Sequence, residues 1–290
     1  MCEPSSEFEL VALKNGGSSL RWLGNGETFH PVVGPMSEAR TLHVDQQRLV
    51  ERARCRSESL VVWDVGLGAA ANALAVVEAF AGREEEGGGW VDLHSFDRSA
   101  APLGFALEHE EELGYLGGYR AVLEELLESA GPFPSARLVH TGRVRWWFHV
   151  GDFEELVKSA ELPAPDAVLY DPYSVAGNRG MWTLEHLRRV RAQLREDKPC
   201  LLSNYTRSTS VRVTLLLAGF YVGLGQGVGE KDQTTVASNV PGLLERPLGR
   251  EWLKRVRAST RGAPLRAGEA EVGAIGASDW ESLEAHPQWR

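Results

Sequence analysis

The sequence has 290 residues, of which 43% are hydrophobic and 24% charged, and its formal net charge is −9 at pH 7. This composition is ordinary for a globular protein, no apolar run approaches the roughly 20 residues that cross a bilayer, and the polar N-terminus does not resemble a secretory signal. The three cysteines, Cys2, Cys55 and Cys200, form no CxxC pattern and have no histidine at metal-ligand spacing, so we expect a reduced, cytoplasmic protein without a structural metal.

The first 50 residues contain turn signals between short apolar pieces. These signals are Gly16-Gly17, Gly24-Asn25-Gly26 and Gly34-Pro35. They predict a small β-rich N-terminal extension over residues 1–50.

From residue 51 onward, short apolar runs alternate with helical periodicity, as in α/β proteins. Continuous runs, typical of strands buried on both faces, lie at 59–64, 91–96, 166–170 and 200–204, and residues 143–150 alternate with a period of two. Helical patterns separate them at 72–81, 103–130, 182–195 and 210–218, and a strand from 219 is expected to pair antiparallel with 234–238. This order predicts a doubly wound, Rossmann-like α/β domain over residues 51–262 and a loosely packed tail over 263–290.

A glycine-rich turn follows the first of these strands. It reads Asp64-Val-Gly66-Leu-Gly68 and leads to Asn72 in the next helix, and the second strand ends at Asp97. Glycines in a strand-to-helix turn let the backbone approach a ligand, and an acid after the next strand is placed to bind a ribose diol. The turn also fits a dinucleotide-binding loop, or a tight turn without any ligand.

The neighbouring acids favour one of these ligands. Asp64 would repel a pyrophosphate, whereas it suits the ammonium and sulfonium charges of S-adenosylmethionine. Gly151-Asp152 follows the third strand. Asp152 is placed to bind the adenine amino group, or to cap the helix that begins near Phe153, and the two roles do not exclude each other.

Asp171-Pro172-Tyr173 follows the fourth strand, at the edge where open α/β sheets bind ligands, and Asn178 and Trp182 come shortly after it. An Asp-Pro-Tyr at this place resembles the substrate-facing motif of methyltransferases that act on nitrogen, although Asp-Pro also begins simple turns. A primary amine must be neutral to attack, so Asp171 is expected to orient the amine first and to accept its proton second.

Short motifs in a fixed order resemble the methyltransferase of the tRNA 5-methylaminomethyl-2-thiouridine pathway, in its stand-alone form without the fused flavin-dependent oxidoreductase domain. The motifs are Gly26-Glu27-Thr28-Phe29-His30, Gly66-Leu-Gly68 with Asn72, Gly151-Asp152, Asp171-Pro-Tyr-Ser with Asn178 and Met181-Trp182-Thr183, Asn204-Tyr205-Thr206 with Val211-Arg212, and Ala218-Gly219-Phe220-Tyr221-Val222-Gly223 with Gly227-Val228-Gly229. The resemblance implies a class I methyltransferase fold, S-adenosylmethionine as cofactor, and methyl transfer to the exocyclic amine of 5-aminomethyl(-2-thio)uridine at the tRNA wobble position. Two places depart from the family pattern. Ala70 stands where the family has a glycine, and Glu230-Lys231-Asp232 stands where it favours consecutive basic residues.

Residue by residue, the resemblance and the motifs imply that Asp171 is the main catalytic residue. The expected cofactor contacts are Asp64, Gly66, Gly68, Asn72, Asp97, Gly151, Asp152 and Asp171. The expected substrate contacts are His30, Pro172, Tyr173, Asn178 and Trp182.

One segment is basic within this acidic protein. Residues 246–266 carry seven Lys and Arg residues against Glu251 alone, a local net charge of +6. The overall charge argues against general nucleic-acid affinity, so this segment is the expected contact for tRNA, or else a solvated helix face. The other hypotheses are a methyltransferase with a different acceptor, a non-catalytic relative that binds RNA or protein, and a nicotinamide-dependent oxidoreductase that uses the Gly66 turn and Asp97.

Overall fold

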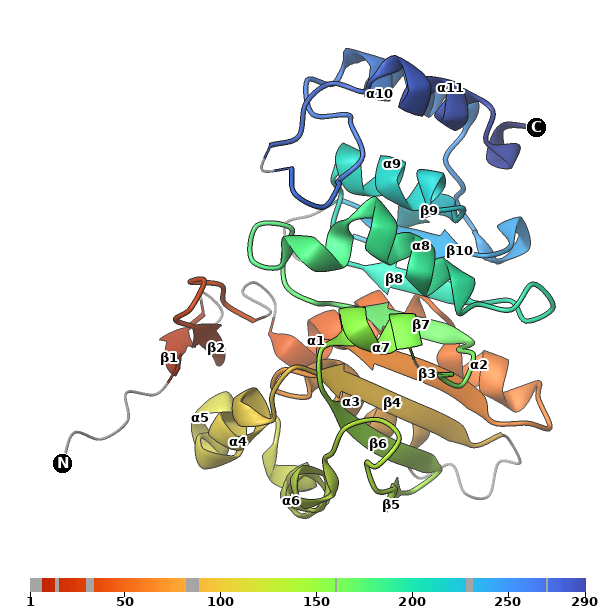
Figure 1. Ribbon diagram of the computed structural model, residues 1–290. Helices are drawn as coiled ribbons and strands as arrows, with labels where there is room; N and C mark the ends of the chain where they lie inside the picture. The colour runs from red at the N-terminus through yellow and green to blue at the C-terminus, as the bar shows by residue number, and fades with distance from the viewer. Residues whose placement is uncertain are drawn as a thin grey trace.

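An eight-stranded sheet runs through the centre of the protein in the order β5-β6-β4-β3-β7-β8-β10-β9 (Figure 1). The structure is a computed structural model that describes residues 7–13, 16–29, 34–81, 89–159, 161–227, 232–269 and 271–290. The five central strands are parallel: β6 (Val144–Val150), β4 (Val91–Asp97), β3 (Leu60–Val65), β7 (Ala167–Tyr170) and β8 (Leu201–Asn204). Antiparallel strands end the sheet: β5 (Val139–Thr141) beside β6, and β10 (Thr234–Ser238) with β9 (Tyr221–Gly225) beyond β8. The predicted doubly wound sheet with a terminal antiparallel strand is confirmed.

Helices cover both faces of this sheet, which explains why β3 and β7 at its centre are almost entirely apolar. In β3, Val62 packs into one core and the next residue, Trp63, into the other, and both side chains are fully buried. The first core contains residues of α2 (Leu49–Arg54), α3 (Ala71–Phe80), α4 (Ala101–Glu108) and α6 (Arg120–Ser129). The second contains residues of α7 (Phe153–Ser159), α8 (Leu184–Ala192) and α9 (Thr209–Leu217). In the described part of the chain, no helix is long and apolar enough to cross a membrane.

The expected helix over 103–130 is divided in the structure. It consists of α4, α5 (Glu110–Leu113), a short 3-10 turn (Gly117–Tyr119) and α6. Gly114 ends α5 with a φ of 74°, a left-handed conformation that glycine adopts without steric cost. The leucine periodicity therefore indicated helical residues correctly and overlooked the glycine breaks.

The N-terminal extension is partly a β-hairpin. Strands β1 (Phe8–Ala12) and β2 (Ser18–Trp22) pair antiparallel outside the main sheet (Figure 1). Phe8 anchors the hairpin on α4, where its ring centroid lies 5.9 Å from that of Phe105. The rest of the first 50 residues includes α1 (Pro35–Ala39) and a π-helical turn at Arg40–Asp45, so the extension is less β-rich than the turn signals predict.

The expectation of a loosely packed C-terminal tail is wrong. Leu265 and Leu283 are fully buried, and α11 (Ala277–Glu284) packs beside α10 (Leu253–Ala258) and α9 (Figure 1). The Gln288 side chain donates to the carbonyls of Val222 and Leu248 at 2.9 and 2.8 Å. A few isolated leucines and one amide fix this segment, and such sparse anchors leave no periodic pattern in the sequence.

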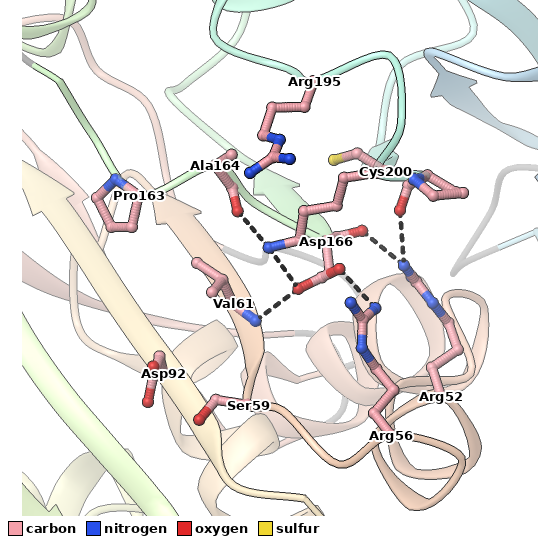
Figure 2. Close-up of polar contacts among 12 residues, drawn as sticks. Arg52, Arg56, Ser59, Val61, Asp92, Pro163, Ala164, Asp166, Arg195 and Cys200 are labelled. Atoms are coloured by element: carbon pink, nitrogen blue, oxygen red, sulfur yellow. Dashed lines mark hydrogen bonds and ion pairs between the residues drawn. The ribbon is translucent and has the colours of Figure 1, made fainter.

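At the amino-terminal edge of the sheet, one buried carboxylate joins three elements. Asp166, just before β7, accepts hydrogen bonds from Arg56 (2.6 Å) and the Val61 amide (2.8 Å), and pairs with Lys198 at 3.1 Å (Figure 2). Arg52 of α2 donates to the Asp166 carbonyl at 2.7 Å. A fully buried charge needs such complete pairing. The cluster holds α2 and the start of β8 to the sheet, at the edge opposite to the carboxyl ends of the parallel strands.

Candidate active site

A cavity of about 440 Å³ lies at the carboxyl ends of β3, β4 and β7. Gly66 and Gly68 line it after β3, Asp97 at the end of β4, and Asp171 after β7. Parallel strands end at the same edge of a sheet, and for this reason residues from distant parts of the sequence meet here. Tyr173 also lines the cavity, so the structure brings five of the predicted site residues together there.

The glycine loop leaves no room for side chains. Gly66 has a φ of 96°, and a Cβ on it would lie 2.5 Å from the carbonyl oxygen of Asp171. Gly68 has a φ of 53°, and its amide donates to Oδ2 of Asp97 at 2.9 Å. The close backbone contact excludes a side chain at Gly66, and the left-handed φ makes a larger residue unfavourable at Gly68. The loop and Asp97 therefore form one hydrogen-bonded wall of the cavity.

Ala70, which replaces a glycine of the family pattern, has a φ of 64°. Its methyl group is fully buried in the first core, and it is not among the residues that line the cavity. The substitution thus adds backbone strain at the start of α3, and its side chain does not enter the candidate site.

Asp64 lies behind the cavity wall. Its carboxylate is fully buried and accepts a hydrogen bond from Ser95 at 2.8 Å. Burial, together with the nearby negative charges of Asp171 and Asp97, raises the pKa of Asp64 to about 7. Its Oδ1 atom has no hydrogen-bond partner among the described residues. A cation bound in the adjacent cavity would favour the charged form of this carboxylate.

Asp171 is fixed by its neighbours. Its amide donates to the Val65 carbonyl at 3.0 Å, and its Oδ2 accepts from Nδ2 of Asn72 at 3.1 Å. Asn72 stands in the first turn of α3 and is almost fully buried. Strand β3, helix α3 and the end of strand β7 therefore all contribute to the position of this carboxylate.

Tyr173 forms an aromatic wall beside Asp171. Its backbone is left-handed, with a φ of 62°, and its carbonyl accepts from the Trp182 indole at 3.1 Å. Its ring centroid lies 5.5 Å from that of Trp22 and 5.3 Å from that of Phe29, both from the N-terminal hairpin region. Burial raises the pKa of Tyr173, and the nearby carboxylates raise it further, so the phenol stays protonated.

Other predicted residues lie outside the cavity lining. Asp152 pairs with Arg98 at 2.9 Å, and its Oδ1 accepts the amide of Glu154 at 2.8 Å, which is a helix-capping contact for α7. The amide of Gly151 donates to the Asp97 carbonyl at 2.8 Å. Pro172, Asn178 and Trp182 support the loop after Asp171 without lining the cavity. His30 lies outside the described residues.

Several residues that line the cavity were not predicted as site residues. They include Glu27, Phe29, Glu38, Tyr115, Tyr205 and Arg207. Glu27, Phe29 and Tyr205 lie in the short motifs quoted above, so their place in these motifs was the sequence signal that could have identified them as site residues. Glu38, Tyr115 and Arg207 have no comparable sequence signal.

The charges of the cavity indicate the kind of ligand that fits. Among the described lining residues, Glu27, Glu38, Asp97 and Asp171 are acidic and Arg207 is the single cation, for a formal net charge of −3. S-adenosylmethionine carries an ammonium, a sulfonium and a carboxylate, so its net positive charge suits such a cavity. The glycine loop and the buried oxygen of Asp64 without a partner fit the same ligand. In the described residues, no group of three or more His, Cys, Asp or Glu side chains is placed to hold a metal ion.

Comparisons with known proteins indicate the class of enzyme. A family model described as S-adenosyl-L-methionine-dependent methyltransferase matches residues 121–240. Over 152 residues, 51% of this chain, the sequence is 35% identical to the tRNA 5-methylaminomethyl-2-thiouridine biosynthesis bifunctional protein MnmC of Ralstonia nicotianae, and the match spans 21% of that protein. The crystal structure of MNMC2 from Aquifex aeolicus superposes with a TM-score of 0.69 at 24% identity, over 97% of this chain and 84% of that one.

The doubly wound sheet, the acidic cavity at its carboxyl edge and the family model define an enzyme, an S-adenosylmethionine-dependent methyltransferase. Within this class, part of the chain is similar in sequence to the bifunctional protein MnmC of Ralstonia nicotianae, of which the match spans 21%, and the fold is that of MNMC2 from Aquifex aeolicus. The two alternatives of a nicotinamide-dependent oxidoreductase and a non-catalytic relative are not supported.

Proposed function

We propose that this enzyme methylates the exocyclic amine of 5-aminomethyl(-2-thio)uridine at the wobble position of tRNA. The observation that carries the proposal is the carboxylate of Asp171 in a cavity with a formal lining charge of −3. The cofactor alone neutralises only part of this charge, so the remaining negative charge favours an acceptor that arrives as a cation. An alkylamine is such an acceptor, since its pKa of ~10 keeps it protonated in water. The name of the Ralstonia relative points to the same chemistry.

The proposed cofactor contacts are the residues of the glycine wall. Gly66 and Gly68 let the backbone approach the ligand, and Asp97, which already holds the Gly68 amide, accepts the ribose hydroxyls. Asp64 stabilises the positive charge from behind the wall. Asp152 is proposed to lie near the adenine, in addition to its capping contact with α7.

When bound, S-adenosylmethionine supplies a methyl group that its sulfonium already activates. Asp171 accepts a hydrogen bond from the ammonium of the acceptor and orients it, then takes up one proton so that the nitrogen attacks as a neutral amine. Asn72 holds Oδ2 of Asp171 at 3.1 Å and thereby limits the rotation of the carboxylate. Alignment of nucleophile and methyl group is the main contribution that a protein makes to this displacement.

The aromatic wall assists by excluding water. Tyr173, Trp22 and Phe29 form an apolar surface next to Asp171. A dry surface disfavours the charged form of a bound amine, whereas the carboxylate favours it. The two effects oppose each other, and this balance lets the amine bind as a cation and still lose a proton.

The basic segment 246–266 is proposed to dock the tRNA. In α10, Leu253 and Val256 are buried whereas Lys254 and Arg255 are exposed. The chain before α10 pairs with β9, since the Leu224 amide donates to the Arg246 carbonyl at 2.8 Å. This pairing places Arg246 four strand spacings from β7, or roughly 19 Å. A folded RNA can bridge that distance from the cavity, whereas a free nucleotide cannot.

The test is methyl transfer by the purified enzyme to tRNA that carries 5-aminomethyl-2-thiouridine, followed by mass spectrometry of the nucleosides. The wild type should add one methyl group to that nucleoside, and Asp171→Asn should lower kcat by roughly 10²–10⁴ while cofactor affinity changes much less. Transfer by Asp171→Asn at the wild-type rate would remove Asp171 from the chemistry. If the wild type binds S-adenosylmethionine but never methylates this tRNA, the acceptor is a different one.

A further inference from the structure

The N-terminal hairpin contacts the loop that follows Asp171 through one carboxylate. Oε2 of Glu27 accepts the amide of Ser174 at 2.9 Å, and Oε1 accepts the Ser174 hydroxyl. Ser174 comes three residues after Asp171, and Glu27 is 147 positions away from it in the sequence. Two hydrogen bonds to one side chain fix both the distance and the orientation between the two segments.

Glu27 is itself held in place before it makes this contact. Its amide donates to Oδ1 of Asn25 at 2.9 Å, and its carbonyl accepts the Trp22 amide at 2.9 Å. Gly177, in the same loop as Ser174, packs so closely that a Cβ there would lie 2.5 Å from Oε1 of Glu27 and 2.6 Å from Nδ2 of Asn25. The segment that contains Glu27 and the loop after Asp171 therefore pack closely against each other.

Between Asp171 and Ser174, the chain is strained. Tyr173 has a left-handed φ of 62°, a conformation that is sterically unfavourable for a bulky residue. Such a conformation persists only where its surroundings impose it. Here Trp22 and Phe29 contact the ring, the Trp182 indole holds the carbonyl, and Glu27 fixes the next residue.

From these contacts we propose that Glu27 is a positioning residue for methyl transfer, and that the hairpin forms the acceptor side of the active site. Glu27 keeps Ser174 in place, Ser174 keeps Tyr173 in its strained conformation, and Tyr173 together with Asn72 sets the position of Asp171. This inference rests on the proposed role of Asp171. Its consequence is that Glu27 acts through hydrogen-bond geometry, so an uncharged side chain of the same shape should replace it.

The kinetic test compares Glu27→Ala, Glu27→Gln and, as the matched control, Glu9→Ala. Glu9 lies on the same hairpin and pairs with Arg21 at 3.1 Å, away from the cavity. We expect Glu27→Ala to lower kcat by about 10- to 100-fold, the scale of a small misplacement of reacting groups, with the Kd for S-adenosylmethionine changed less than about 3-fold. Glu27→Gln retains an acceptor for the Ser174 amide, and its kcat should stay within about 3-fold of the wild-type kcat. If Glu27→Gln lowers kcat as much as Glu27→Ala does, the positioning role is overturned, because the negative charge of Glu27 would then be the property that the reaction needs.

A second measurement needs no acceptor. Hydrogen–deuterium exchange of residues 171–178 should be faster in Glu27→Ala than in Glu9→Ala or wild type, because the Ser174 amide loses its partner. Unchanged exchange in Glu27→Ala would overturn the contact itself. If the wild type fails to methylate the proposed tRNA while Glu27→Ala accelerates exchange in this loop, the proposed acceptor is wrong and the positioning contact stands.

Discussion

The side-chain amide of Asn72, in the first turn of α3, donates a 3.1 Å hydrogen bond to Oδ2 of Asp171, just after β7. Asn72→Ala should lower kcat by roughly 10- to 100-fold, the effect of removing one hydrogen bond to a charged group. In a background that already carries Asp171→Asn, the same change should have almost no further effect, since the two residues act as one unit. Steady-state kinetics of the wild type, the two single variants and the double variant give the four kcat values. If the two losses of kcat are additive, Asn72 acts independently of Asp171.

Asp97→Ala should weaken binding of S-adenosylmethionine by about 1–3 kcal/mol, because the variant loses both the proposed ribose contact and the hydrogen bond that orders Gly68. The matched control is Asp92→Ala, at the other end of β4, where the carboxylate pairs with Arg145 at 2.6 Å. Calorimetric titration gives the two affinities. Equal affinities in the two variants would exclude Asp97 from the cofactor site.

The pH dependence of stability should report on Asp64. Its pKa in the folded protein is raised to about 7 by burial, so the folded state holds a proton that the unfolded chain releases near its ordinary pKa of ~4. The stabilisation from this group is complete below pH ~4 and is lost as pH rises to about 7, at up to roughly 1.4 kcal/mol per pH unit. Asp64→Asn should remove this slope, and Ser95 can still donate to the amide oxygen.

Chemical denaturation of the wild type and Asp64→Asn across pH 4–8 checks this prediction. The difference between the two proteins isolates Asp64 from His94 and His149, whose pKa values burial lowers to about 3 and about 4. These histidines act in the opposite direction, since their stabilisation is lost as pH falls below ~6.5. Parallel pH profiles for the two proteins would contradict the raised pKa of Asp64.

Ala70→Gly should leave the protein as stable as the wild type or stabilise it by up to about 1 kcal/mol, because glycine adopts the left-handed conformation at residue 70 without strain. Cofactor affinity should not change, since the Ala70 side chain does not line the cavity. Ala75→Gly, within α3, is the control and should destabilise by about 1 kcal/mol or more. Urea denaturation gives the free energy of unfolding of both variants. A similar decrease of this free energy in Ala70→Gly and Ala75→Gly would refute the strain at Ala70.

The double reversal Lys254→Glu/Arg255→Glu should raise the KM for tRNA and flatten its dependence on salt, because fewer phosphate contacts release fewer counterions. Arg257 is left intact because its guanidinium lies 4.3 Å from the Trp280 ring centroid and supports the tail. The control reverses Arg120 and Arg137, both near α6. If both double variants show the wild-type salt slope, α10 is only a solvated face.

Most of the parallel sheet was predictable because strands such as β3 and β7 are buried on both faces. Leu60–Val65 is apolar apart from Asp64, and such continuous runs differ plainly from the helices between them. The glycine loop was predictable for a related reason, since a strand-to-helix turn next to a ligand needs residues without side chains, and Gly66 and Gly68 supply them.

Only the tertiary structure decided what else surrounds Asp171. Glu27 meets Ser174 across 147 positions of sequence, and Tyr205 and Glu38 reach the same cavity from separate loops and helices. The tail was misjudged for the same reason, because Leu265, Leu283 and Gln288 are single anchors whose partners lie far away in the chain. Periodicity records only the contacts that repeat along one element, whereas an active site and a docked tail consist of contacts that occur once, between elements that the fold brings together.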